Sequence, residues 1–161
     1  IALLTISDTR SLADDSSGDQ LQRSLEAAGH RLHERQLCPD DRYQIRRELS
    51  RWIADPEVDV VITSGGTGLT GRDGTPEAVV PLLDKTIEGF GELFRVLSFE
   101  SIGTSTLQSR CLAGVANGTF VFVLPGSLDA VTTAWDKLIR AQLDEQTRPC
   151  NLAQLRARLK E

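Results

Sequence analysis

The sequence lacks the features that mark several classes of protein. No apolar run approaches the roughly 20 residues that a bilayer-spanning helix needs, so no membrane association is expected. The three cysteines, Cys38, Cys111 and Cys150, are odd in number and widely spaced, so they indicate neither a disulfide framework nor a paired zinc motif. Reduced thiols in a cytoplasmic protein are the simpler interpretation.

Basic residues are also too few for a nucleic-acid-binding surface. The chain has 18 lysines and arginines against 23 acidic residues, a formal net charge of -5. Nucleic acids and anionic membranes are held mainly by clustered basic side chains, so neither is expected as a partner. A small anionic ligand remains compatible with this charge, because backbone N–H groups or a bridging metal can bind it locally.

Several well-known catalytic and nucleotide-binding motifs are missing as well. The glycine-rich stretch at 65–68 is not followed by Gly-Lys-Ser/Thr, so it is not a Walker A loop, and it lacks the GxGxxG spacing of dinucleotide-binding folds. The Gly-x-Ser-x-Gly pattern of a nucleophile elbow does not occur. Covalent catalysis by a serine hydrolase is therefore not expected.

What the chain does contain predicts one α/β domain over residues 1–161. With 161 residues, 40% of them hydrophobic and 25% charged, it is long enough to bury a core of its own. Apolar, β-branched segments at 3–6, 31–37, 58–63 and 119–124 predict strands. The first, third and fourth are nearly continuous apolar runs, which is typical of strands covered on both faces of a parallel sheet. We interpret the first as a core strand with residues missing before it, rather than as a secretory signal.

Helical periodicities lie between these strands. Gly29 is placed to end the first helix, Thr75 to cap the third, and Pro149 to stop the last long one. The apolar stripes that indicate these helices are Leu21, Leu25 and Ala28; Ile45, Leu49, Trp52 and Ile53; Phe90, Leu93, Phe94 and Leu97; and Leu128, Val131, Trp135, Leu138 and Ile139. For Phe90, Phe94 and Trp135 a core position is favoured over an interface. The alternation predicts a three-layer α/β/α fold with a mostly parallel central sheet.

Small, hydroxyl-bearing and acidic residues follow every predicted strand. In open α/β sheets, ligands bind beyond the carboxyl ends of the strands, so these loops are expected to form one site. The candidate residues are Ser7 and Asp8; Asp40; Ser64, Gly65, Gly66, Thr67 and Gly68; and Pro125, Gly126 and Ser127. Each loop alone has a structural alternative: a turn at Ser7-Asp8, a helix cap at Asp40-Asp41, and a turn into the last helix at Ser127.

The glycine-rich stretch leaves N–H groups free to face an anion, although a tight strand-to-helix connection without a ligand is its alternative. Just after it, Arg72 could donate two hydrogen bonds to phosphate oxygens while Asp73 binds magnesium. Glu77 lies in the first turn of the predicted third helix. The alternative for Arg72 and Asp73 is a surface ion pair, which stabilises by only about 0 to 1 kcal/mol.

Residues 63–68 and 71–78 resemble the signature of the MoaB/MogA family of molybdenum cofactor biosynthesis. The similarity extends over nearly the whole chain. It includes residues 7–9, 39–40, 102–110, 125–127 and 147–151, and Gly74 together with the last two stretches points to the MoaB branch.

This resemblance implies binding of molybdopterin, a pterin phosphate, and assembly into a homo-oligomer, either a trimer or a hexamer. In active members, AMP from ATP is joined to that phosphate with magnesium present. By position, Asp40 and Asp73 correspond to the family's functional aspartates and Ser127 to a serine at the pterin or phosphate site. Gly65 to Gly68 correspond to its glycine loop, and Ser7 and Glu77 are further candidates. The alternative is a non-catalytic molybdopterin-binding or carrier protein, in contact with other proteins of the same pathway.

Overall fold

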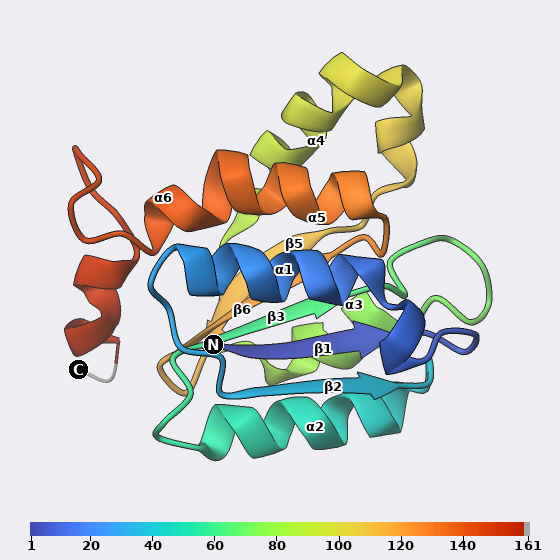
Figure 1. Cartoon of the computed structure of the whole chain (residues 1–161), viewed down its shortest axis with the longest axis horizontal. Helices are drawn as coiled ribbons and strands as arrows, with labels where there is room; N and C mark the ends of the chain where they lie inside the picture. Colours follow the sequence, from blue (N-terminus) through green and yellow to red (C-terminus); the bar gives the residue numbers. More distant parts are fainter. Residues whose placement is uncertain (160–161) are drawn as a thin grey trace.

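A mixed sheet of six strands forms the centre of the computed structural model, which describes residues 1–159 (Figure 1). The strands are β1 (Ala2–Ile6), β2 (Glu34–Cys38), β3 (Val60–Ser64), β4 (Lys85–Thr86), β5 (Leu112–Ala116) and β6 (Thr119–Leu124), in the spatial order β2-β1-β3-β6-β5-β4. Neighbours among β2, β1, β3 and β6 are parallel, whereas β5 is antiparallel to both β6 and β4. The predicted three-layer α/β/α fold is confirmed.

Helices cover both faces of this sheet. They are α1 (Ser16–Ala27), α2 (Arg42–Ala54), α3 (Thr75–Val79), α4 (Glu88–Ile102), α5 (Leu128–Ala134) and α6 (Arg140–Gln142), with a π-helical turn η4 (Trp135–Ile139) between the last two. Short 3-10 helices are η1 (Leu12–Asp14), η2 (Val80–Leu82), η3 (Gly103–Gln108) and η5 (Ala153–Arg158). α1, α4 and α5 lie on one face, and α2 and α3 on the other (Figure 1).

Every residue of β1, β3 and β6 is buried, which confirms that these strands are covered on both faces. Alternate side chains point to opposite faces, so each strand contributes to two hydrophobic clusters. Leu3, Ile62 and Phe122 pack under α1, α4 and α5, and Leu4 and Val61 pack over α2 and α3. Packing on both faces holds the strands rigidly, and so positions the loops that follow their carboxyl ends.

The core positions predicted for Phe90, Phe94 and Trp135 are confirmed, since all three side chains are buried in the first cluster. In contrast, the outer end of α4 and η3 extends away from the sheet (Figure 1). Large apolar side chains are exposed along this arm: Leu93, Val96, Phe99, Ile102 and Leu107. Among residues 1–159, no helix is both long and apolar enough to span a membrane.

The helix predicted to begin at Thr75 does begin there, but the predicted cap of this helix and the predicted end of the last helix are wrong. Thr75 does not cap α3, because Gly74 is the N-cap and the Thr75 hydroxyl donates instead to the carbonyl oxygen of Gly65, 3.0 Å away. Pro149 does not stop the last helix either, since α6 ends at Gln142. There the Asp144 carboxylate accepts the backbone N–H of Gln146 and starts a loop well before the proline.

The strands β4 and β5 were not predicted, and the second predicted strand begins at Glu34 rather than at residue 31. A tight turn at Asn117 and Gly118 joins β5 to β6, and both residues have positive φ angles. An Asn-Gly pair between apolar segments is a strong hairpin signal. It could have identified β5 from the sequence.

Candidate functional site

Four loops leave the carboxyl end of the sheet next to one another, after β1, β2, β3 and β6. The backbone connects them directly. The N–H of Ser7 donates to the carbonyl of Cys38, and the N–H of Gly65 donates to the carbonyl of Leu124, each at 3.0 Å. A Cβ built on Gly126 would lie 3.2 Å from the Cα of Gly65, so the third and fourth loops touch. The predicted convergence of the loops is therefore present.

The glycine loop, residues 65–68, turns sharply at its first two glycines. Gly65 has φ +106° and Gly66 has φ +63°, a region that side chains with a Cβ rarely adopt. The loop is held against the start of α3, where the Thr75 hydroxyl donates to the Gly65 carbonyl and the Thr75 N–H donates to that of Gly66. Both glycines are thus needed for the backbone to fold back on itself.

Asp40 lies against this loop and does not cap α2. Asp41 provides the cap, by accepting the N–H groups of Tyr43 and Gln44. The Asp40 carboxylate accepts the N–H of Gly74 at 3.2 Å. Burial raises the pKa of Asp40, and the nearby charges of Asp73 and Asp8 raise it further against the opposing effect of the Gly74 N–H. A cation bound nearby would therefore stabilise the charged form of Asp40.

Asp73 lies against the last residue of the loop, since a Cβ built on Gly68 would come within 2.7 Å of its carboxylate. It does not pair with Arg72. Its Oδ2 accepts the backbone N–H of Thr70 at 2.9 Å and the Thr70 hydroxyl at 2.5 Å. The hydroxyl bond is the main reason why the pKa of Asp73 is lowered, and the N–H groups of Thr70 and Gly68 add to it. Asp73 is thus held as a carboxylate.

Arg72 forms a bidentate ion pair with Asp8, in the loop that follows β1. Its Nε and Nη2 donate to the two oxygens of that carboxylate at 2.9 and 2.7 Å. The Asp8 carboxylate also accepts the N–H of Asp40 at 3.0 Å. The pKa of Asp8 is lowered, first by the Arg72 hydrogen bond and then by the Asp40 N–H. The guanidinium that was predicted to bind phosphate is therefore engaged within the protein.

The serines of the candidate site satisfy local backbone groups. The Ser7 hydroxyl accepts the N–H groups of Thr9 and Arg10, as the turn alternative predicts. The Ser127 hydroxyl caps α5 by accepting the N–H of Ala130 at 3.2 Å. The Ser127 side chain is nevertheless exposed, whereas Ser64 is buried at the end of β3.

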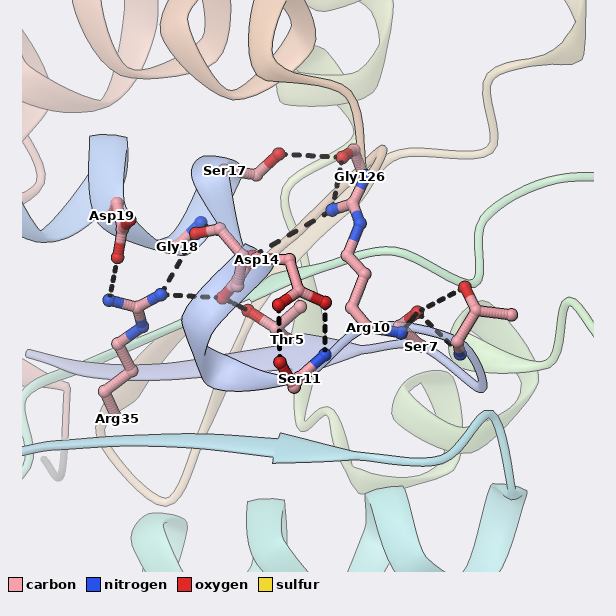
Figure 2. A network of polar contacts seen from close by, with 12 residues as sticks. Thr5, Ser7, Arg10, Ser11, Asp14, Ser17, Gly18, Asp19, Arg35 and Gly126 are labelled. Carbon is pink, nitrogen blue, oxygen red and sulfur yellow. Dashed lines mark hydrogen bonds and ion pairs between the residues drawn. The ribbon is translucent and has the colours of Figure 1, made fainter.

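Two arginines that were not predicted as site residues hold the loops in place. Arg10 donates to the carbonyl of Gly126 at 3.1 Å, and the Ser17 hydroxyl donates to the same oxygen at 2.8 Å (Figure 2). Arg110 binds the glycine loop and the Glu77 carboxylate. Arg110 lies two residues before the start of β5 at Leu112. Because this strand is antiparallel, its start lies at the same edge as the ends of the parallel strands, and a sequence analysis that missed β5 could not place Arg110.

A groove of about 450 Å³ runs from the glycine loop along α4. Its floor is partly apolar, and hydroxyl and amide groups lie around it. The lining residues are Thr67, Gly68, Phe94, Ser98, Ile102, Ser105, Gln108, Ser109, Pro125, Gly126, Ser127, Asp129 and Ala130. Neither Asp40 nor Asp73 is among them. The two carboxylates thus flank the loop that closes one end of the groove.

A protein-family model described as a probable molybdopterin binding domain matches residues 2–145. The chain belongs to this family, the MoaB/MogA family. It is 54% identical over 151 residues to molybdenum cofactor biosynthesis protein B of Escherichia coli, an alignment that covers 94% of this chain and 89% of the relative.

Solved structures of MoaB/MogA family members have the same fold. A crystal structure of molybdenum cofactor biosynthesis protein B superposes with a TM-score of 0.85 at 45% identity, covering 88% of this chain and 89% of the other. The tungsten cofactor synthesizing protein MoaB of Pyrococcus furiosus gives a TM-score of 0.83 at 32% identity, covering 99% and 96%. The resemblance noted from residues 63–78 is confirmed.

Proposed function

We propose that the chain binds molybdopterin and transfers AMP from magnesium-bound ATP to the terminal phosphate of the pterin. The observation that carries this proposal is the glycine loop, which has the Asp40 carboxylate against Gly66 and the Asp73 carboxylate against Gly68, and which lines one end of the groove along α4. Bare backbone, acidic groups and a partly apolar groove together suit a flat heterocycle that bears a phosphate. The family membership supports the choice of pterin.

The groove supplies what a pterin would need. Ile102 offers an exposed apolar side chain to the ring next to the buried Phe94, and Ser98, Ser105 and Gln108 offer hydrogen-bonding groups to its edges. At the other end, Thr67, Gly68 and Ser127 lie where the phosphate would enter. This orientation brings the phosphate to the glycine loop, where it can meet the nucleotide.

The acidic groups fit magnesium that arrives with a nucleotide. Within residues 1–159, no group of three or more His, Cys, Asp or Glu side chains forms a complete metal site. Magnesium bound at nucleotide sites commonly takes only one or two carboxylates and fills its other positions with water and phosphate oxygens. Asp40 and Asp73 would hold it, and the ion would neutralise charge on the triphosphate.

The chain's own residues then have mainly a positioning task. The attacking phosphate oxygen is already anionic near neutral pH, so no strong general base is required. The residues must bring several negative groups together for in-line attack on the α-phosphorus. The N–H groups of Gly65 and Gly68 bond within the protein, to the Leu124 carbonyl and the Asp73 carboxylate, so the expectation that the whole loop leaves its N–H groups free is only partly met. Those of Gly66 and Thr67 would orient the phosphates, and the closely packed loops would fix the distance between the two substrates.

A non-catalytic molybdopterin-binding or carrier protein is the second candidate. It is favoured by the position of Asp40 and Asp73, which flank the glycine loop but do not line the groove. To separate the two, the purified protein is incubated with molybdopterin, labelled ATP and magnesium. Formation of adenylylated pterin and pyrophosphate supports the transferase, whereas pterin binding without product supports the carrier.

The proposal includes a homo-oligomer, a trimer or a hexamer, in the cytoplasm, where the chain would meet other proteins of cofactor assembly. The exposed apolar side chains of the α4–η3 arm support self-association, because contiguous apolar patches often mark protein interfaces. The free thiols of Cys38, Cys111 and Cys150 fit a reducing compartment. Light scattering tests the oligomer, and a strict monomer would contradict it.

A further inference from the structure

We propose that Arg110 is a positioning residue for the candidate site, which fixes the shape of residues 67–73 and thereby the place of Asp73. This inference rests on the proposed function, since it assigns Arg110 a part in presenting the glycine loop to a phosphate ester. Arg110 lies between η3 and β5, and its side chain is 28% exposed.

One guanidinium binds both ends of an exposed segment. The Nε of Arg110 donates to the carbonyl of Gly68 at 2.9 Å and, more weakly, to that of Thr67 at 3.3 Å. Its Nη2 donates to the carbonyl of Asp73 at 2.8 Å. The intervening residues 69–72 are exposed. The Arg110 side chain therefore links the two ends of the exposed segment, at Gly68 and Asp73.

These contacts set the direction of the glycine loop. Carbonyl groups that accept from Arg110 must point toward it, and the peptide planes that carry them are fixed with them. The bond to the Asp73 carbonyl acts on the residue whose carboxylate lies against Gly68. Arg110 thus controls both the backbone that would meet a phosphate and the carboxylate beside it.

Glu77 completes the arrangement as the carboxylate partner of Arg110. The Nη1 of Arg110 donates to Oε1 of Glu77, on the first turn of α3. Although burial raises the pKa of Glu77, the hydrogen bond and charge of Arg110 outweigh it and the pKa is lowered. Glu77, predicted to bind substrate, would then act indirectly by orienting the guanidinium that holds the loop.

The planar shape of the guanidinium explains how one side chain can hold several carbonyl groups of this loop. A guanidinium presents five N–H donors in a rigid plane, so it can reach several acceptors in different directions at once. A lysine ammonium keeps the charge but cannot reproduce this fork. Comparing Arg110→Lys with Arg110→Gln therefore separates positioning of the loop from simple attraction of an anion.

The first measurement is hydrogen–deuterium exchange of the amides in residues 67–74, in the full chain without ligand. Arg110→Gln and Arg110→Lys should both accelerate this exchange by about tenfold, because charged hydrogen bonds to the backbone are lost. Arg31→Gln is the matched control, since it removes an exposed arginine whose partner is Glu57. Unchanged exchange in Arg110→Gln would overturn the proposal, whatever the protein binds.

The second measurement is binding of inorganic pyrophosphate with magnesium to the same proteins. Both Arg110 variants should lose about tenfold in affinity, while Arg31→Gln should match the unchanged chain. Retention of full affinity by Arg110→Lys alone would overturn positioning in favour of charge attraction. If the unchanged chain binds no pyrophosphate, the proposed function fails, and the exchange result alone then decides whether Arg110 shapes the loop.

Discussion

Gly66 lies directly against Asp40: a Cβ built on the glycine would come within 2.6 Å of the Asp40 Oδ2. The same added atom would overlap the Thr75 hydroxyl, which holds the loop to α3. Gly66 also has φ +63°. The smallest residue is thus required here by backbone conformation and by the approach of two side chains from different loops.

Gly66→Ala should therefore distort the loop, and we expect affinity for pyrophosphate with magnesium to fall at least about tenfold. The added methyl group must displace either the Asp40 carboxylate or the Thr75 hydroxyl. Gly71→Ala is the control, because a Cβ there meets no atom within 4 Å. Isothermal titration calorimetry measures both. Equal affinity of the two variants would show that the glycine loop does not form the phosphate site.

Asp73→Asn should abolish adenylyl transfer while molybdopterin binding survives. The amide keeps an oxygen that can accept from the Thr70 N–H, so the loop should remain folded, but the charge proposed to hold magnesium is lost. We expect turnover to fall by about a hundredfold or more. Asp136→Asn, an exposed change on η4, serves as the control. An Asp73→Asn variant with full turnover would remove this carboxylate from the mechanism.

The ion pair of Asp8 and Arg72 allows a test of whether Arg72 can bind a phosphate ligand once Asp8 no longer holds it. Asp8→Asn should release the guanidinium and remove a nearby negative charge, so pyrophosphate affinity should rise about threefold or more. Stability should change little, because the pair is exposed and screened by solvent. Arg72→Gln should weaken binding in either background. Weaker binding by Asp8→Asn would instead indicate that Asp8 is needed to hold Arg72 in place.

The fold was largely predictable because its parallel strands carry nearly continuous apolar runs. The strands β1, β3 and β6 within these runs are buried on both faces, and such runs have few other structural solutions. β4 was missed because it has only two exposed residues, Lys85 and Thr86. β5 contains glycine and alanine rather than large β-branched side chains, so its apolar signal is weak.

The sequence predicted which loops form the site, but it did not predict which side chains in those loops contact one another. Strand order places the residues after β1, β2, β3 and β6 together, which is a consequence of topology. The partner of each charged group depends on loop conformation. Arg72 selects Asp8, which is 64 residues away in sequence, rather than its neighbour Asp73. No periodicity in the sequence encodes such a pair.

The buried carboxylate of Asp15 gives a prediction on the pH dependence of stability. Asp15 is fully buried, accepts the Thr5 hydroxyl at 2.6 Å and the Gly18 N–H at 3.0 Å, and pairs with Arg35 at 2.9 Å. Figure 2 shows Thr5, Gly18 and Arg35 gathered around this point. Burial raises the pKa of Asp15, but these hydrogen bonds together outweigh it and hold the pKa below the ordinary value of an aspartate.

Because the folded-state pKa is lowered, Asp15 stabilises the protein above the unfolded-state pKa, and this contribution is lost as the pH falls through the lower folded value. Asp15→Asn should reduce the free energy of unfolding by about 3 kcal/mol at pH 7, since it leaves the Arg35 charge without its buried partner. The difference from the unchanged chain should persist at about pH 5 and shrink below about pH 4. Asp136→Asn is the control, because Asp136 is exposed on η4. Urea unfolding followed by circular dichroism measures all three proteins, and a pH-independent difference would mean that the Asp15 charge contributes nothing to stability.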